Sequence, residues 1–295
     1  MRTLTQHMER FPDEDSCRAY LAELRWQDGV RCPRCASEKV HKINRPWTWQ
    51  CKQCTKSGYK FTPLVGTIFE NTNYPLRTWF QVIYLMCQSK KGMSALQIHR
   101  TIGSGSYRTA WYMCHRIRAA MENESFDKLM GTVEVDETYV GGKAHNKHGG
   151  SGGSRGGGRR GGRGPSFGKV TVVGAIARKG KVIAKVVDAT DAKTLQGFVN
   201  EAVSDRVGLV ATDEHRSYMG MQFPHESVAH ARGEYVRGEV HTASIDSFWS
   251  LLKRGIMGSY HQVSRAYLPL YLAEFSFRHN ARKEPDMFER VIRQA

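Results

Sequence analysis

Four cysteines near the start of this 295-residue chain have the spacing of a metal site. Cys32 and Cys35 form one CxxC pair, and Cys51 and Cys54 form a second pair. Two such pairs can place four thiolates tetrahedrally around one Zn²⁺, which supplies folding energy to a segment too short to form its own core. Because cysteines fill all four coordination positions, we expect a structural zinc ion rather than a catalytic one.

Basic and aromatic residues surround these cysteines. The bases are Arg31, Arg34, Lys39, Lys42, Lys52, Lys56 and Lys60. The aromatic residues are Trp47, Trp49, Tyr59 and Phe61. We expect the rings to form the core of a small metal-held domain, and platforms for stacking nucleic-acid bases are the alternative. The remaining cysteines lie in apolar patterns and are expected to be buried thiols: Cys17, Cys87 and Cys114.

Three aspartates further along the chain could hold divalent metal ions. Asp136 lies within an apolar strand pattern, and Asp213 ends another, where an ionised carboxylate is costly unless it pairs or binds a metal. Asp246 and Lys253 share the polar face of a predicted helix, because a step of seven residues returns to the same face. Two carboxylates on adjacent strands and one on a facing helix can converge on a pair of metal ions, as phosphoryl transfer requires. Lys253 is then placed to hold a DNA phosphate.

Other acids keep this assignment open, since no single acid identifies a site. Neighbours that could take the place of the first two aspartates are Glu134, Glu137 and Glu214. Rivals for the third position are Glu234 and Glu239.

The hydrophobic patterns predict elements that would position these residues. Helical periodicity occurs at residues 12–26 and three times within 76–121. Strand patterns follow at 132–140, 169–177 and 181–189, then a helix at 192–203, a strand at 208–215 and further helices. This order predicts an α/β domain with a mixed sheet.

We therefore divide the chain into four predicted parts. They are an N-terminal helix at 1–29, a zinc ribbon at 30–62, a helical DNA-binding segment at 63–130 and a catalytic domain at 131–295. The catalytic domain contains a loop at 141–168 that is rich in glycine and arginine.

The helical segment resembles a helix-turn-helix. A first helix, a turn with Gly103 and a second helix carrying His115 fit the geometry that places the second helix in a major groove. The predicted DNA-contacting bases on it are Arg108, Arg116 and Arg118. A helical linker that packs on the catalytic domain is the alternative.

The charge distribution favours a polyanionic partner. The formal net charge is +16, and residues 39–118 hold thirteen Lys or Arg and one acid. Residues 141–168 add six bases and no acid. Such local excess favours a nucleic acid as the partner over a merely solvated basic surface. Together with the segment that resembles a helix-turn-helix, it makes double-stranded DNA the expected partner. The N-terminus has no apolar core of a signal peptide and no apolar run is long enough to span a membrane, so we expect a soluble, cytoplasmic, nucleoid-associated protein without a membrane partner.

Several motifs resemble one known family. VEVDETYVGG, ATDEHRSY, HTASIDSFWSLLKRGIMGSYHQVS and YLAEFSFRHNAR are similar to the DDE transposases of bacterial insertion sequences, in the group numbered fifteen ninety-five that begins with a zinc ribbon. The N-terminal FPDEDSCRAYLAELRW and CPRC and the helical GMSALQIHRTIG match this group as well. The resemblance implies an RNase H-like fold and Mg²⁺-dependent DNA strand transfer. By motif position, Asp136 and Asp213 are the first two catalytic acids. Asp246 takes the third position, where relatives usually carry Glu or Asn, and Lys253 matches the base seven residues later.

These observations support one hypothesis and leave two alternatives. The chain is expected to be a transposase that binds the ends of its element and joins them to target DNA, with Mg²⁺ or Mn²⁺ at the acids. We expect it to act as a homodimer or a larger homo-oligomer on DNA. The alternatives are a catalytically inactive DNA-binding protein derived from a transposase, and a nuclease on the same fold.

The loop at 141–168 yields a testable prediction. It has too few apolar side chains to pack, so we expect it to be flexible and to bind phosphates through Arg155, Arg159, Arg160 and Arg163. Deleting the loop should weaken binding to two unrelated duplexes by a similar factor, because phosphate contacts carry no sequence information. Unchanged affinity for both duplexes at low salt would identify the loop as an inert spacer.

Overall fold

The computed structural model describes residues 3–54, 57–122, 127–141, 169–228 and 241–295. The chain folds into two compact units, one formed by Met1–Glu124 with Ala281–Ala295 and the other by Ser125–Asn280. The four parts predicted from the sequence stay predictions. Residues named above that lie outside the described residues are Lys56, Arg155, Arg159, Arg160, Arg163, Glu234 and Glu239.

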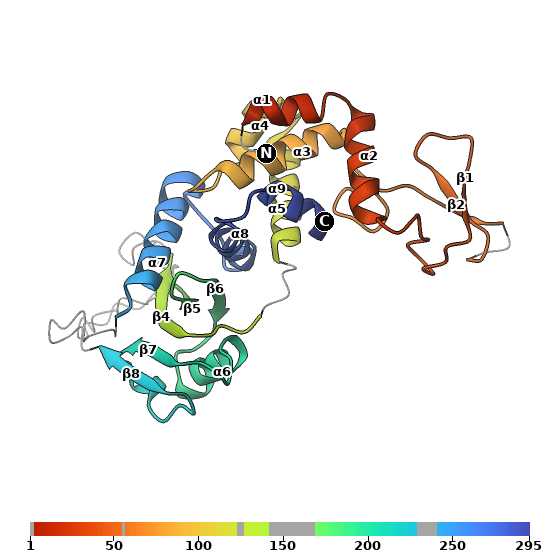
Figure 1. Ribbon diagram of the computed structural model, residues 1–295. Helices are drawn as coiled ribbons and strands as arrows, with labels where there is room; N and C mark the ends of the chain where they lie inside the picture. The colour runs from red at the N-terminus through yellow and green to blue at the C-terminus, as the bar shows by residue number, and fades with distance from the viewer. Residues whose placement is uncertain (1–2, 55–56, 123–126, 142–168, 229–240) are drawn as a thin grey trace, which may run out of the picture. The chain divides into compact units, whose positions relative to one another are not determined.

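The first unit combines the N-terminal helices with the last helix of the chain (Figure 1). Its helices are α1 (Leu4–Arg10), α2 (Glu14–Arg25), α3 (Leu76–Gln88), α4 (Ala95–Ile102), α5 (Tyr107–Glu122) and α9 (Met287–Gln294). Aromatic rings form its core: Phe80 meets Phe11 and Phe288 edge to face, at centroid distances of 5.0 and 5.3 Å. Each such contact adds about 0.5–1.5 kcal/mol to the free energy gained by burial.

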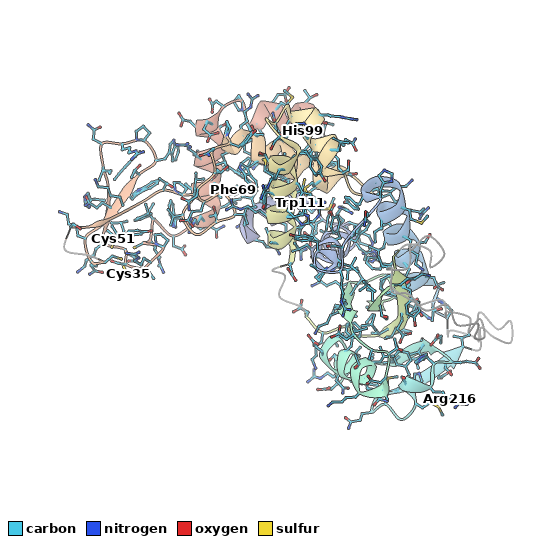
Figure 2. All side chains as sticks on the ribbon, turned by 180° about the vertical axis from the view of Figure 1, so that it is seen from behind. Cys35, Cys51, Phe69, His99, Trp111 and Arg216 are labelled. Atoms are coloured by element: carbon cyan, nitrogen blue, oxygen red, sulfur yellow. The ribbon has the colours of Figure 1, made fainter. Side chains whose placement is uncertain are left out.

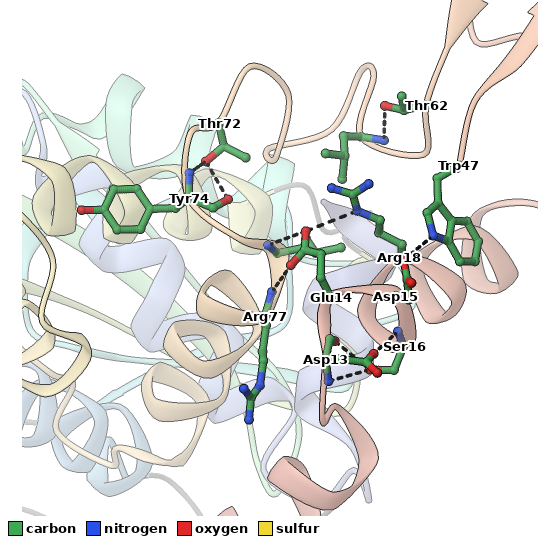
Figure 3. Close-up of polar contacts among 12 residues, drawn as sticks. Asp13, Glu14, Asp15, Ser16, Arg18, Trp47, Thr62, Thr72, Tyr74 and Arg77 are labelled. Atoms are coloured by element: carbon green, nitrogen blue, oxygen red, sulfur yellow. Dashed lines mark hydrogen bonds and ion pairs between the residues drawn. The ribbon is translucent and has the colours of Figure 1, made fainter. Parts of the chain in front are cut away.

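A carboxylate from α2 caps the start of α3. The N-cap of α3 is Pro75, which makes no side-chain cap hydrogen bond. Glu14 supplies this cap instead, because its Oε1 and Oε2 accept hydrogen bonds from the backbone N–H groups of Leu76 and Arg77 at 3.1 and 3.2 Å (Figure 3). The two helices are thereby joined by a charge-assisted contact at a helix N-terminus, where the helix dipole favours negative charge.

The turn between α4 and α5 follows the sequence prediction. Ser94 caps α4 by accepting from the N–H of Gln97, and Gly103 ends it in the left-handed conformation at φ 64°. The side chains of His99 and Ser104 then hydrogen-bond at 2.7 Å, which fixes the turn into α5. The three helices predicted within 76–121 are therefore confirmed.

Three short strands form the zinc-ribbon sheet, β1 (Val40–Lys42), β2 (Trp49–Cys51) and β3 (Tyr59–Phe61), paired antiparallel in that order. Cys32, Cys51 and Phe61 are buried at its centre, and Trp49 and Tyr59 pack against them. These rings are core residues, as expected. The Trp47 ring lies beside that of Trp49 at a centroid distance of 6.5 Å, and its indole N–H donates to Asp15 Oδ1 of α2 at 2.7 Å (Figure 3).

A five-stranded mixed sheet organises the second unit. Its strands are β4 (Thr132–Val140), β5 (Val170–Ala177), β6 (Val182–Val187), β7 (Leu209–Asp213) and β8 (His225–Val228). The order is β6-β5-β4-β7-β8, in which β4, β5 and β6 pair antiparallel and β7 and β8 extend the sheet in parallel with β4. Its helices are α6 (Ala192–Ala202), the 3₁₀ turn η2 (Arg216–Tyr218), α7 (Ala243–Gly255), the π-helical turn η4 (Ile256–Tyr260) and α8 (Leu268–Asn280).

Each face of this sheet has its own core. On one face, Val135 packs with Leu195 of α6. On the other face, Val172 packs with Ile245 of α7 and Leu272 of α8. Alternate residues of β4 therefore face different helices, which is why eight of its nine residues are buried or half-buried.

The predicted mixed α/β fold with flanking helices and a preceding zinc ribbon is confirmed. The sequence did not predict α1, which has only seven residues, or β8, whose polar sequence HESV lacks a strand pattern, and it did not predict the short turns η2 and η4. Among the described residues, no helix combines the length and apolar character needed to cross a membrane.

His7 of α1 is a buried titratable group in the aromatic core. It is 1% exposed, and within the described part of the chain neither ring nitrogen has a hydrogen-bond partner. Its ring stacks on Tyr84 at 4.7 Å. Burial, followed by the charge of Arg10, lowers the pKa of His7 to about 4.

This pKa predicts that the first unit loses stability in mild acid. The unfolded chain takes up a proton on His7 near pH 6.5, whereas the folded chain resists protonation until about pH 4. The free energy of unfolding should therefore fall between pH 7 and pH 5, by the order of 2 kcal/mol from this residue. Urea unfolding at both pH values should show a smaller fall for His7→Phe than for the parent. The exposed control His41→Phe should behave as the parent, and an equal pH dependence in all three proteins would contradict the account.

Candidate active site

The register of the β4–β7 pair brings two predicted acids together. The parallel pairing aligns Val133 with Val210 and Glu134 with Ala211. Two residues further on, the same register sets Asp136 level with Asp213, on the same face of the sheet. Both side chains are half-buried at this position.

Glu137 completes a cluster of three carboxylates. Asp136, Glu137 and Asp213 each place one oxygen within 4.8 Å of the others. Glu137 leaves β4 on the opposite face from Asp136, and the fully buried Tyr218 of η2 donates its hydroxyl hydrogen to Glu137 Oε1. The sequence identified Glu137 only as a neighbour that could substitute for Asp136, because alternation along a strand separates adjacent side chains.

Two carboxyl groups of the cluster have raised pKa values. Burial, followed by the charges of Glu137, Asp213 and Asp246, raises the pKa of Asp136 to about 7. Burial also raises the pKa of Glu137 to about 7, against the hydrogen bond from Tyr218 that lowers it, while the charge of Asp213 raises it further. Within the described ranges, none of the three clustered acids forms an ion pair.

Helix α7 has the two faces that the sequence predicted. Ile245, Phe248, Trp249 and Leu252 are buried, whereas Asp246, Ser250 and Lys253 are exposed. Asp246 lies in the first turn and accepts a hydrogen bond from Thr242 Oγ1 at 3.2 Å. It is near enough to raise the pKa of Asp136, but it is not within the cluster of mutually close oxygens.

Glu134 fixes the start of α7 against β4. The N-cap Thr242 makes no side-chain cap hydrogen bond, and the fully buried Glu134 takes its place. Its Oε2 accepts from the N–H groups of Ser244 and Ile245 at 2.7 and 3.1 Å, and its Oε1 pairs with Arg178 Nε at 3.0 Å. The Glu134 carboxylate accepts four hydrogen bonds, which offset the cost of burying its charge. Glu134 therefore anchors α7 to β4 and is not a free metal ligand.

The donor set of the cluster fits a hard divalent cation. Carboxylate oxygens are the ligands that Mg²⁺ and Mn²⁺ favour. Crowded, half-buried carboxylates with raised pKa values gain from a cation that neutralises them. Asp136 and Asp213 are the predicted ligands that the fold brings together, and Asp246 approaches from the facing helix.

The four ribbon cysteines fit one zinc ion. Cys32 Sγ lies 3.4 Å from Cys54 Sγ, and Cys35 Sγ lies 3.7 Å from Cys51 Sγ (Figure 2). A tetrahedron with Zn–S bonds of about 2.3 Å has edges of about 3.8 Å, so the sulfurs are already at ligand spacing. Burial acts to raise the pKa of the Cys32 thiol, but the N–H groups of Arg34 and Cys35 and the neighbouring thiols bring it down to about 7.

The predicted DNA-contacting arginines of α5 differ in accessibility. Arg108 is exposed, and its guanidinium group contacts Tyr112 by a 3.3 Å hydrogen bond to the hydroxyl group. Arg116 is half-buried and donates to the carbonyl oxygen of Glu70. Arg118 is 1% exposed because it lies on the core side of the helix, so it presents no surface to DNA in this structure. The sequence predicted all three arginines as DNA contacts from their charge. The packing of α5 shows that they differ in exposure.

The comparisons with known proteins agree with these geometries. The ISXO2-like transposase domain model matches residues 128–280, and the transposase zinc-ribbon domain model matches residues 12–57. The chain belongs to the ISXO2-like transposase family.

A relative in Halobacterium salinarum aligns with nearly the whole chain. This protein, described as an uncharacterized protein in transposable element ISH50, is 29% identical over 288 residues, which cover 94% of this chain and 95% of the relative. No solved structure matches the transposase. The matches support a zinc ribbon and a DDE domain, for which a divalent metal is implied.

The ribbon geometry predicts one zinc ion per chain of this transposase. Cys51→Ser should reduce the zinc content to near zero, because it removes one of the four clustered thiolates that hold the ion. The control Cys17→Ala, at a buried cysteine of α2, should keep the full zinc content. Elemental analysis of the purified proteins measures both. Zinc that is absent from the parent, or unchanged by Cys51→Ser, would contradict the assignment.

Proposed function

We propose that this transposase binds the ends of its insertion sequence and catalyses cleavage and transfer of DNA strands at Asp136, Asp213 and Asp246. The observation that carries the proposal is the alignment of Asp136 with Asp213 across β4 and β7, in a cluster of acids without a cationic partner among the described residues. The family match supplies the reaction class.

The carboxylates define what the site does chemically. Asp136 and Asp213 present oxygens from adjacent strands, and Asp246 adds a carboxylate from α7. A divalent cation bound by them, Mg²⁺ or Mn²⁺, would neutralise the negative charge that gathers on a phosphodiester under attack. Lys253 is exposed two turns after Asp246 and is available to a DNA phosphate.

The proposed reaction has two successive displacements at phosphorus. In strand cleavage, a water oxygen bonds to phosphorus while the bond from phosphorus to the 3′-oxygen breaks, and that oxygen takes a proton to become a free 3′-hydroxyl group. In strand transfer, this hydroxyl group loses its proton as its oxygen bonds to a phosphorus of the target DNA, and the displaced 3′-oxygen of the target takes up a proton. The acids act in both steps by holding the same charge-neutralising arrangement in place.

DNA recognition is proposed for the first unit. The exposed N-terminal part of α5 offers Arg108, and the ribbon adds exposed bases such as Arg34 and Lys60. This surface fits the insertion of α5 into a major groove, with phosphate contacts from the ribbon. We include Arg116 only as a secondary contact and leave Arg118 out, because Arg118 is buried. Assembly of two or more chains on DNA stays a prediction.

Substitution of the acids should separate catalysis from binding. Asp136→Asn and Asp213→Asn should each lose strand cleavage and transfer by several orders of magnitude, while affinity for element ends stays within a few-fold of the parent. The reason is that Asn keeps the shape of Asp but loses most of its affinity for a divalent cation. The control Glu226→Gln changes an exposed acid of β8 and should leave both properties unchanged. Cleavage of a labelled end duplex in Mg²⁺ and its binding in Ca²⁺ measure the two properties.

The same assay identifies the third ligand. Asp246→Ala should abolish cleavage and Asp246→Glu should keep it if α7 supplies the ligand. Loss of cleavage in Glu137→Gln, with normal activity of Asp246→Ala, would move the role to the acid that already lies in the cluster. Normal cleavage by Asp136→Asn would overturn the transposase mechanism and favour a DNA-binding protein without catalysis.

A further inference from the structure

Trp249 of α7 contacts the first acid of the cluster directly. Its indole Nε1–H donates to Asp136 Oδ2 at 3.0 Å, and the ring is 3% exposed. Helix α7 runs beside β4 (Figure 1), so this bond crosses from the helix to the strand. An indole N–H only donates and does not titrate, so it holds a carboxylate oxygen without competing for a cation.

The fold reserves space for this ring. Gly174 of β5 pairs with Asp136 across the β4–β5 ladder. A Cβ atom at Gly174 would lie 2.6 Å from both Cη2 and Cζ2 of Trp249, closer than any stable contact. Glycine at this position therefore lets the indole ring come close enough to the sheet to reach Asp136, although glycine weakens a strand interior.

Hydrogen bonds at the start of α7 fix where Trp249 lies along β4. Glu134 caps α7 through the N–H groups of Ser244 and Ile245, one turn before Trp249. Glu134 and Asp136 are alternate residues of β4 and face the same side of the sheet. Two contacts, one at the helix start and one at Trp249, thus set the position of α7 relative to the acid.

We propose that Trp249 is a positioning residue that orients the Asp136 carboxylate for divalent-metal binding. Its N–H uses one lone pair of Oδ2 and fixes the rotation of the carboxylate, so that the remaining lone pairs of both oxygens have a set orientation. Such a hydrogen bond to a ligating carboxylate raises metal affinity because the orientation is set before the metal arrives. The proposal rests on the proposed function, in which Asp136 is a metal ligand.

The test measures Mn²⁺ affinity of the full-length, zinc-loaded protein in the absence of DNA. Trp249→Phe keeps an aromatic ring but removes the N–H donor, so Mn²⁺ affinity should fall about 10- to 100-fold. Trp47→Phe is the matched control, because it removes an indole N–H bond to a carboxylate, that of Asp15, far from the acids in the sequence. Its Mn²⁺ affinity should equal that of the parent. Free Mn²⁺ is counted by electron paramagnetic resonance.

A shape-preserving variant separates the hydrogen bond from packing. Incorporation of 3-benzothienylalanine at position 249 replaces the N–H by sulfur in a ring of nearly the same shape. We expect the same loss of Mn²⁺ affinity, with a melting temperature close to that of the parent. Parent-like affinity in this variant would overturn the proposal, whether or not Trp249→Phe folds.

Failure of the proposed function gives a different result. Asp136→Asn should bind Mn²⁺ more weakly than any Trp249 variant, because it loses the ligand itself. Parent-like affinity in Asp136→Asn would reject Asp136 as a ligand. Weak binding by Asp136→Asn with parent-like binding by the benzothienyl variant would reject only the role of Trp249.

Discussion

The parallel pairing of β4 with β7 is the constraint on which the acid cluster depends. It sets Asp136 level with Asp213, and a shift of one residue would turn every side chain of the strand to the opposite face. Apolar side chains on both faces of β4 specify the register, because Val133 and Val135 lie in the core with α6 and Val140 lies in the core with α7. Hydrophobic burial therefore supplies the free energy that holds like charges together.

Carboxylates also organise the helices around that sheet. Both α3 and α7 begin without a side-chain cap of their own, and each is capped by a glutamate from another element, Glu14 and Glu134 respectively. This arrangement couples the start of each helix to its neighbour, whereas a local cap would satisfy only the helix itself. In the second unit, the cap from Glu134 holds α7 on the face of β4 where Asp136 lies, so that Asp246 and Trp249 lie near that acid.

Sequence patterns predicted the elements well where the physical signal is local. The CxxC spacing predicted the sulfur cluster, and the periodicity of α7 predicted which of its residues are buried. The strand at Val170–Ala177 was expected within one residue of its observed start, since an apolar run between turn residues is distinctive. By contrast, the four-residue strand β8 has no such pattern, because its stability comes from pairing with β7.

The sequence predicted the two aspartates of the cluster, but it did not predict how the fold places the other residues around them. Glu137 joins the cluster through its length and its bond to Tyr218, which alternation along the strand does not reveal. The burial of Arg118 depends on packing around α5, so composition placed it on the DNA-binding face with Arg108. The anchoring role of Glu134 depends on a helix 110 residues away in the chain, and only the fold brings the two together.

The central claim is that Asp136 and Asp213 hold a divalent cation, and iron-directed cleavage of the polypeptide tests it most directly. Fe²⁺ bound in place of Mg²⁺ generates hydroxyl radicals with ascorbate and peroxide, which cut the backbone close to the metal. In zinc-loaded protein we expect cuts near both residues, on β4 and β7, that excess Mg²⁺ suppresses. Cuts confined to other segments, or cuts at these strands that persist in Asp136→Asn, would contradict the account.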